Sequence, residues 1–242
     1  MANGQYAHWM VIIMPTAWSN ETKNETALPR IGICIPYFGN LNLEWVEMTY
    51  IPLLYKQTNW CQKLAFLCKV PSIPVARDML IKQALQQNCD YVFFIDTDLI
   101  FEDPTDPNIA LYQLYQKTNK SKDSKDGKII SGLYRAKKDN VFNYAMWIKH
   151  DNAFLPIAEW KDNFLEADVA GAGCCLIDME VFKNIPRPYF RWEESGEMSE
   201  DFYFFQLAKK NGYNLHILTD IKMSHLGNVK IKCNGDIVYS EI

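Results

Sequence analysis

The sequence predicts an α/β protein with a mostly parallel central sheet flanked by helices, and with a small antiparallel portion. Two observations predict this class. Residues 91–95 (Tyr-Val-Phe-Phe-Ile) are apolar or aromatic without alternation, as is typical of a strand buried on both faces. Residues 63–70, 76–87 and 91–95 follow one another as strand, helix and strand. That order favours parallel pairing through a right-handed crossover.

The composition is that of a globular protein with a full core. The chain has 242 residues, of which 48% are hydrophobic and 22% charged, enough for one large α/β domain. We expect that domain to span residues 30–242, after an extension at residues 1–29 that lacks clean periodicity. A net charge of −4 gives no indication of a nucleic-acid partner.

Cysteine usage and hydropathy predict the cellular compartment and whether the chain crosses a membrane. The seven cysteines show no Cys-x-x-Cys spacing, which predicts buried free thiols in a reducing, cytoplasmic compartment. The apolar run at residues 9–14 is far shorter than the roughly twenty residues that cross a bilayer. We therefore expect no transmembrane segment.

The first strong strand is predicted at residues 31–35 and is ended by Pro36. Residues 37–40 would then form the loop at its carboxyl end. Residues 43–55 are predicted to be helical, with a kink or an end at Pro52.

The next two elements prepare the central strand. Residues 63–70 form a second predicted strand, ended by Pro71. In the helix at 76–87, apolar side chains recur every four residues, and Arg77 lies in its first turn. This places Arg77 near the sheet edge where a ligand would bind.

The second half of the chain is predicted to contain a mixture of elements. Residues 167–175 contain two glycines, Gly171 and Gly173, which permit close approach of the backbone to a ligand or form a tight turn with a bulge. Ser199 is the predicted N-cap of the last helix. The other predicted elements are a helix at 107–118, strands at 128–134 and 215–218, antiparallel edge pieces at 142–148 and 154–159, and the helix at 199–210.

Two carboxylates follow the central strand directly, in Asp96-Thr97-Asp98. Open α/β sheets bind ligands at the carboxyl ends of their strands. Carboxylates this close repel each other unless a cation lies near them. A hard divalent ion such as Mg²⁺ or Mn²⁺, which also binds phosphate, suits these oxygen ligands. A polar strand end followed by a turn is the alternative.

Taken in order, these features resemble the GT-A glycosyltransferases, which have a Rossmann-like fold, and especially the inverting family 2 type. The resemblance runs from about residue 31 to residue 227. The residues that carry it are the strand ending at Pro36, Ala-Arg-Asp at 76–78, Asp-x-Asp at 96–98, Ser-Gly-Leu-Tyr at 131–134, Gly-Ala-Gly-Cys at 171–174, Glu-Asp at 200–201, and His225.

The resemblance implies a transfer of sugar from a nucleoside-diphosphate sugar, with a UDP-sugar favoured, to a hydroxyl of a glycan or other acceptor. Asp98 would bind Mn²⁺ or Mg²⁺ directly, and Asp96 would bind the donor ribose, or the metal through water. His225 would be a further metal ligand or a diphosphate contact. Asp201 would be the general base that gives inversion, with Glu200 as the alternative base or an acceptor contact. The implied substrate-binding residues are Pro36, Tyr37, Arg77, Asp96, Thr97, Gly173 and Trp192.

Two other functions are compatible with parts of the pattern. Phosphotransferases of the haloacid dehalogenase type also end a buried strand with Asp-x-Asp, using the first Asp as nucleophile and the second as general acid. That motif usually follows the first strand of the domain, whereas two strands precede it here. A non-catalytic nucleotide-sugar or glycan-binding module is the third reading, although a pure binder does not need the base at Asp201.

Overall fold

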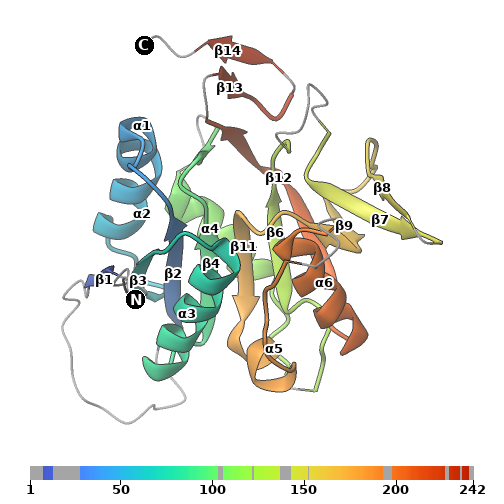
Figure 1. Cartoon of the computed structure of the whole chain (residues 1–242), viewed down its shortest axis with the longest axis horizontal. Helices are drawn as coiled ribbons and strands as arrows, with labels where there is room; N and C mark the ends of the chain where they lie inside the picture. The colour runs from blue at the N-terminus through green and yellow to red at the C-terminus, as the bar shows by residue number, and fades with distance from the viewer. Residues whose placement is uncertain are drawn as a thin grey trace, which may run out of the picture.

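The computed structural model describes residues 8–12, 28–102, 106–121, 123–136, 143–151, 153–192, 198–226, 229–234 and 236–239. Eleven strands form one large sheet, whose main path runs β1-β3-β2-β4-β11-β6-β12-β13-β14; β5 and β9 each pair with β12. A separate three-stranded antiparallel sheet has the order β10-β7-β8. Figure 1 shows this small sheet at the right-hand edge of the molecule, beside α6.

The N-terminal half of the large sheet follows the prediction. β2 (Arg30–Tyr37) lies between β3 (Gln62–Lys69) and β4 (Tyr91–Ile95), and both pairings are parallel. α3 (Ile73–Gln86) connects β3 to β4, and its apolar face is buried at Ala76, Leu80 and Ala84. The predicted strands at 31–35, 63–70 and 91–95 and the helix at 76–87 are therefore confirmed.

The predicted helix at residues 43–55 has an irregular middle. It consists of α1 (Leu43–Trp45), the π-helical turn η1 (Val46–Tyr50) and α2 (Ile51–Tyr55). Pro52 lies at the start of α2, where its missing N–H is tolerated. The proline therefore marks a change of helix type, and the helix continues past it.

The C-terminal half of the sheet is mixed. β11 (Cys174–Asp178) is antiparallel both to β4 and to β6 (Ile129–Leu133), and β6 is parallel to β12 (Leu215–His225). β12 also pairs antiparallel with three further strands, and additional antiparallel pairings complete both sheets. The remaining strands are β1 (His8–Ile12), β5 (Leu99–Phe101), β7 (Met146–His150), β8 (Ala153–Pro156), β9 (Phe164–Ala167), β10 (Val169–Ala170), β13 (Val229–Ile231) and β14 (Ile237–Tyr239).

The expected GT-A, Rossmann-like fold with a mostly parallel central sheet flanked by helices is therefore wrong. Among the described residues, three pairings of the large sheet are parallel: β2 with β3, β2 with β4, and β6 with β12. The error has a physical cause. No strand was predicted at residues 174–178, where β11 lies antiparallel to both β4 and β6. Continuous apolar character such as that of β4 reports burial of both faces, not strand direction.

Other predictions had the right type of element but the wrong extent. The strand predicted at 215–218 runs on to residue 225, and strands at 8–12, 99–101, 164–167, 169–170, 174–178, 229–231 and 237–239 were not predicted. Of the extension predicted at 1–29, residues 8–12 form β1 and residues 28–29 precede β2; the others lie outside the described residues. The helix predicted at 107–118 is α4 (Pro107–Lys117), and the antiparallel pieces predicted near 142–159 are β7 and β8.

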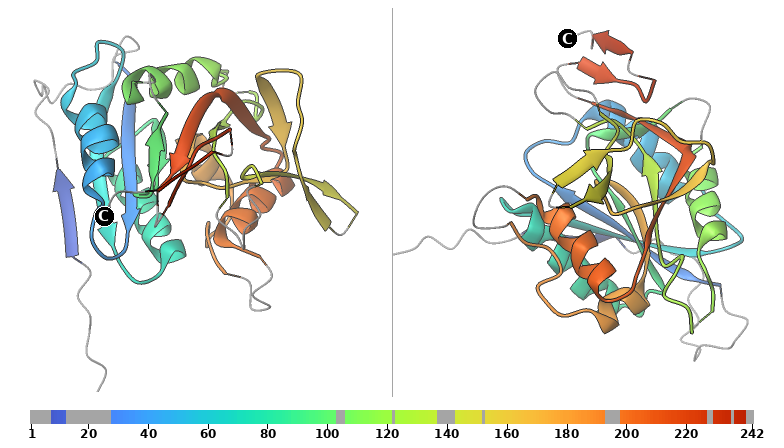
Figure 2. Two further views of the ribbon diagram at one scale, coloured as in Figure 1. Left: turned by 90° about the horizontal axis from the view of Figure 1, so that it is seen from above. Right: turned by 90° about the vertical axis from the view of Figure 1, so that its right-hand side faces the viewer.

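Helices cover parts of both faces of the large sheet, as the left panel of Figure 2 shows. On one face, side chains of α3, α5 (Met179–Asn184) and α6 (Glu200–Lys210) join the first core cluster. On the other face, Trp45, Leu53 and Leu111 of α1, α2 and α4 join the second. All seven cysteines are buried and free, as predicted. No described helix is long and apolar enough to span a membrane.

Candidate active site

The Asp-x-Asp segment begins where β4 ends, beside the start of β11. Antiparallel pairing places Cys174 opposite Ile95, so Gly173 comes next to Asp96. The Asp96 N–H donates to the Gly173 carbonyl at 2.9 Å, and the Gly173 N–H donates to the Tyr134 hydroxyl at 3.1 Å. A Cβ at position 173 would lie 2.7 Å from Asp96 Oδ2. Only glycine therefore fits behind this carboxylate.

Three carboxylates surround a buried arginine. Arg77, on α3, is 1% exposed, and its Nη2 atom donates to both carboxylate oxygens of Asp96 at 3.1 and 3.2 Å. Its Nε lies 3.8 Å from Glu200 Oε1, and its Nη2 lies 3.7 Å from Asp201 Oδ1. Glu200 and Asp201 occupy the first turn of α6, after the N-cap residue Ser199, whose side chain makes no capping bond.

The charges of this Arg77 cluster (Arg77, Asp96, Glu200 and Asp201) shift one another's pKa values. Burial disfavours the guanidinium charge, but the nearby carboxylates outweigh that effect and raise the pKa of Arg77. Burial is the main cause that raises the pKa of Asp201 to about 7, against the attraction of Arg77 and with repulsion from Glu200 and Asp96. Burial likewise raises the pKa of Glu200 and of Asp96. One guanidinium does not fully neutralise three carboxylates.

A second, more open pair lies at the same edge. β5 and β12 are antiparallel, with His225 opposite Leu99. This pairing brings His225 next to Asp98, although the two residues are 127 positions apart in the sequence. His225 Nε2 lies 3.0 Å from Asp98 Oδ2, and the Leu226 N–H donates to the Asp98 carbonyl at 2.6 Å. The Asp98 side chain is 48% exposed and that of His225 is 13% exposed.

The second ring nitrogen of His225 fixes its orientation. Nδ1 lies 2.9 Å from the Arg135 carbonyl oxygen, which can only accept, so Nδ1 carries a proton. Both ring nitrogens thus face acceptor oxygens, so a proton or a metal ion must lie between Nε2 and Asp98 Oδ2. Histidines that bind metals are held in this way, with one N–H on a carbonyl and the other nitrogen on the ion.

These residues fit a divalent cation that brings ligands of its own. Two adjacent ligands of a six-coordinate ion, each about 2.1 Å from it, stand about 3 Å apart, which matches the Asp98–His225 spacing. No set of three or more His, Cys, Asp or Glu side chains arranged for a metal occurs in the described part of the chain. Mg²⁺-type ions commonly take one or two protein ligands and complete their shell with phosphates and water.

A cleft of about 490 Å³ joins the two groups. Its lining includes eight of the predicted residues: Pro36, Tyr37, Arg77, Asp96, Thr97, Asp98, Glu200 and Asp201. His225 is not among the residues that line the cleft, but it contacts Asp98, which is. Gly173 lies behind Asp96 with both backbone groups hydrogen-bonded. Trp192 is 56% exposed and is not among the residues that line the cleft.

Several residues of the site were not singled out from the sequence. Phe38 is 70% exposed in the loop after β2 and lines the cleft, as do Asn40 and Leu226. Tyr134 holds Gly173 and lies edge-on to His225, with ring centroids 5.8 Å apart. The Ser-Gly-Leu-Tyr motif contained that tyrosine, but its role required the three-dimensional contact. An aromatic residue followed by glycine in the loop predicted at 37–40, Phe38-Gly39, was a sequence signal that could have identified this residue.

Comparison with known proteins adds evidence on the fold alone. No protein-family model matches the chain, and no curated protein matches it either. Among solved structures, the chain is similar to the structure described as "Crystal Structure of A197 from STIV", with a TM-score of 0.59 and 16% sequence identity. The similarity covers 89% of this chain and 95% of A197. At this identity the likeness shows a shared fold.

Proposed function

We propose that this protein is a metal-dependent glycosyltransferase that uses a nucleoside-diphosphate sugar, with a UDP-sugar favoured, and inverts the anomeric centre. One observation carries the proposal. A single cleft is lined by Asp201, whose side chain is 18% exposed and whose pKa is raised to about 7, and by Asp98, whose side chain is 48% exposed and lies 3.0 Å from His225 Nε2. This reaction needs a base on one side of the reacting carbon and diphosphate binding on the other.

Asp98 and His225 would hold Mn²⁺ or Mg²⁺ at the open end of the cleft. When bound, the ion supplies positive charge to the diphosphate oxygens of the leaving group. Asp96 has a different role, because both of its carboxylate oxygens accept from Arg77. We assign it to the donor ribose, at the boundary between the Arg77 cluster and the open pair. Arg77 then acts as a positioning residue that orients the carboxylates.

Asp201 would accept the proton of the acceptor hydroxyl. The acceptor oxygen attacks the anomeric carbon as the bond from that carbon to the diphosphate oxygen breaks, so the product has the inverted configuration. A general base works best with a pKa near the working pH, and burial gives Asp201 such a value. Glu200, 6% exposed and pointed at Arg77 Nε, has less access to an acceptor.

The phosphotransferase alternative is disfavoured by the surroundings of Asp96. That mechanism uses the first carboxylate of the motif as a nucleophile, and an attacking oxygen needs an available lone pair. Both oxygens of Asp96 accept from a buried guanidinium, which lowers their nucleophilicity. A pure binding module has no use for the raised pKa of Asp201.

The test is a release assay with UDP-, GDP- and dTDP-sugars in the presence of Mn²⁺, with and without a panel of glycan acceptors. We expect nucleoside diphosphate to be released from one donor class, and to be released faster with an acceptor. Asp201→Asn should lose this acceptor-dependent release. Its matched control is Asp123→Asn, at an exposed aspartate in a distant loop, which should behave as the wild type does. Hydrolysis of phosphate monoesters with no reaction of any nucleotide sugar would overturn the proposal.

A further inference from the structure

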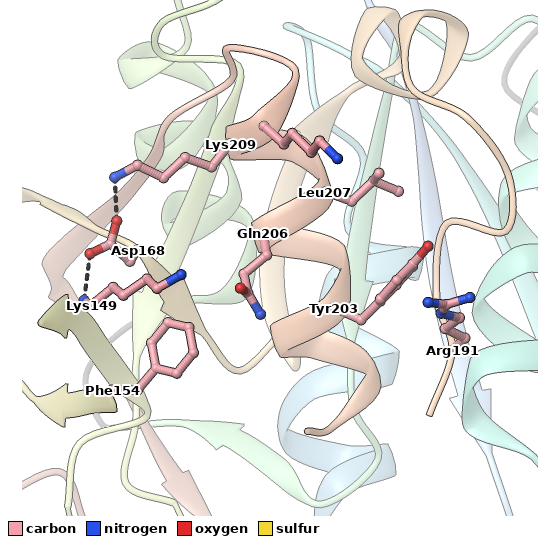
Figure 3. A pocket seen from close by; sticks show the side chains of 9 residues that line it. Lys149, Phe154, Asp168, Arg191, Tyr203, Gln206, Leu207 and Lys209 are labelled. Carbon is pink, nitrogen blue, oxygen red and sulfur yellow. Dashed lines mark hydrogen bonds and ion pairs between the residues drawn. The ribbon is translucent and has the colours of Figure 1, made fainter. Parts of the chain in front are cut away.

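A second cavity, of about 620 Å³, surrounds the exposed face of α6. We call it the α6 groove. Figure 3 shows Lys149 and Phe154 on one side of the helix and Arg191 on the other. Tyr203, Gln206 and Leu207 of α6 form its floor, and Asp168, Lys209 and Lys210 complete the lining.

The α6 groove is basic in a chain that is acidic overall. Four of its lining side chains are Lys or Arg, and one is an aspartate, whereas the whole chain carries a net charge of −4. That aspartate, Asp168, is paired with Lys209. Within the described part of the chain, Lys149, Arg191 and Lys210 are in no ion pair with a carboxylate. Three positive charges therefore face solvent around one cavity.

Helix stability does not account for this arrangement. Lys209 and Lys210 lie in the last turn of α6, where positive charge complements the helix dipole. Lys149 and Arg191 come from β7 and from the segment before α6, so they gain nothing from that dipole. Arg191 lies over the Tyr203 ring at 4.5 Å, which orders both side chains.

The groove also presents surfaces that suit sugar rings. Tyr203 and Phe154 are half-buried aromatic side chains, and Gln206 offers an amide beside them. Aromatic faces pack against the apolar faces of sugar rings, and an amide can both donate to and accept from hydroxyls. Tyr203 lies two residues after Asp201, about 3 Å further along the helix axis and about 200° around it, so the two side chains point to opposite sides of α6.

We infer that the α6 groove binds an anionic saccharide, a sugar chain that carries carboxylate, sulfate or phosphate groups. Its charged groups contact Lys149, Arg191 and Lys210, and its rings lie on Tyr203 and Phe154. The assignment of this saccharide as the acceptor rests on the proposed function, because the sugar chain would extend around the start of α6 toward Asp201. The binding itself rests on the groove alone.

The test is calorimetric titration of the full chain with three hexasaccharides at 50 mM and 150 mM NaCl. They are a galacturonic acid hexamer, a heparin-derived hexasaccharide and neutral maltohexaose. We expect one or both anionic probes to bind with a salt-dependent affinity, and maltohexaose to bind at least tenfold more weakly. The carboxylate and sulfate probes distinguish the source of the charge.

Matched triple variants assign the binding to the groove. Lys149→Ala, Arg191→Ala and Lys210→Ala together should weaken binding about tenfold or more. Lys82→Ala, Lys117→Ala and Lys232→Ala together remove the same charge from exposed lysines elsewhere and should leave affinity unchanged. Both variants should melt as the wild type does, since all six side chains are exposed.

Equal affinity in the two triple variants, equal affinity for neutral and anionic probes, or no binding at all would overturn the inference. Binding to phosphatidylserine vesicles without binding to any hexasaccharide would also overturn it, in favour of a membrane surface. None of these readouts uses nucleotide or turnover. A failure of the glycosyltransferase proposal in the release assay is therefore separate from a failure here.

Discussion

Asp96 and Asp98 stand two residues apart after the same strand, yet the structure surrounds them differently. Asp96 accepts two bonds from Arg77, which is 1% exposed, and shares that guanidinium with Glu200 and Asp201. Asp98 is 48% exposed and faces a histidine whose other nitrogen is fixed by a backbone carbonyl.

The difference shows how one sheet edge can do two kinds of chemistry. In the Arg77 cluster the protein supplies the cation itself, and burial leaves one carboxylate with a pKa near neutrality. In the Asp98–His225 pair, we propose that the cation arrives from solution with the substrate. Under the proposed function, the first group takes part in proton transfer and the second holds the diphosphate. Each prediction below tests one side of this comparison.

The largest effect is expected from Asp201→Asn. An asparagine keeps the size of the side chain but cannot accept a proton, so transfer should fall by about 10²–10⁴-fold. Nucleotide binding should stay within about twofold of wild type, because the open pair is unchanged. Single-turnover transfer and calorimetry measure the two quantities separately. A fully active variant would show that Asp201 is not the base.

Replacement of Arg77 tests whether its positive charge stabilises the folded protein. Arg77→Met leaves three carboxylates beside one another in a buried site and should cost about 3–5 kcal/mol in the free energy of unfolding at pH 8. Urea unfolding measures this, with Lys82→Met on the exposed side of the same helix as control. Adding Asp201→Asn should restore part of the loss. A cost below about 1 kcal/mol would contradict the cluster's role in stability.

Substitutions in the Asp98–His225 pair should change the Mn²⁺ requirement of nucleotide binding, whereas substitutions in the Arg77 cluster should not. Asp98→Asn and His225→Ala should each raise the Mn²⁺ concentration needed for half-maximal nucleotide binding about 10–100-fold. Their unfolding free energies should change by less than those of Arg77 variants. His150→Ala, at an exposed histidine, is the control. An unchanged Mn²⁺ requirement for His225→Ala would leave that residue a purely structural role.

The smallest effect concerns stability and pH. The folded pKa of Asp201, about 7, lies above its ordinary value of 3.8, so the folded state binds this proton more tightly. The stability that the proton provides is present below pH 4 and is lost as pH rises toward 7. Relative to wild type, Asp201→Asn should therefore gain stability from pH 5 to pH 7, by at most about 1.4 kcal/mol per pH unit, and then level off. Parallel curves for the two proteins would contradict the raised pKa.

The sequence predicted those parts of the molecule that depend on local pattern. The run at 91–95, the helical repeat at 76–87 and the position of Asp96 and Asp98 after a buried strand all follow from neighbouring residues. Strand direction in the second half does not, because β11 pairs antiparallel with β4 and β6 at a segment for which no strand was predicted. The mostly parallel sheet was wrong for this reason.

Long-range contacts set the rest of the site. The sequence singled out Arg77 as a nucleotide contact, but only the fold shows that it is buried under three carboxylates. His225 gained its partner from the β5–β12 register, and β5 itself is three residues long. Trp192 was chosen for its residue type, and it lies outside the cleft lining. Tyr134 acts through contacts that no spacing along the chain reveals.

The most direct test of the contrast between the two groups is calorimetric titration with UDP, GDP and dTDP, each with and without Mn²⁺. The account predicts that one nucleotide binds when Mn²⁺ is present, and that this binding is lost without the ion and in Asp98→Asn. Equal affinity with and without Mn²⁺, or no binding of any nucleotide, would contradict the claim that the Asp98–His225 pair holds a metal-bound diphosphate.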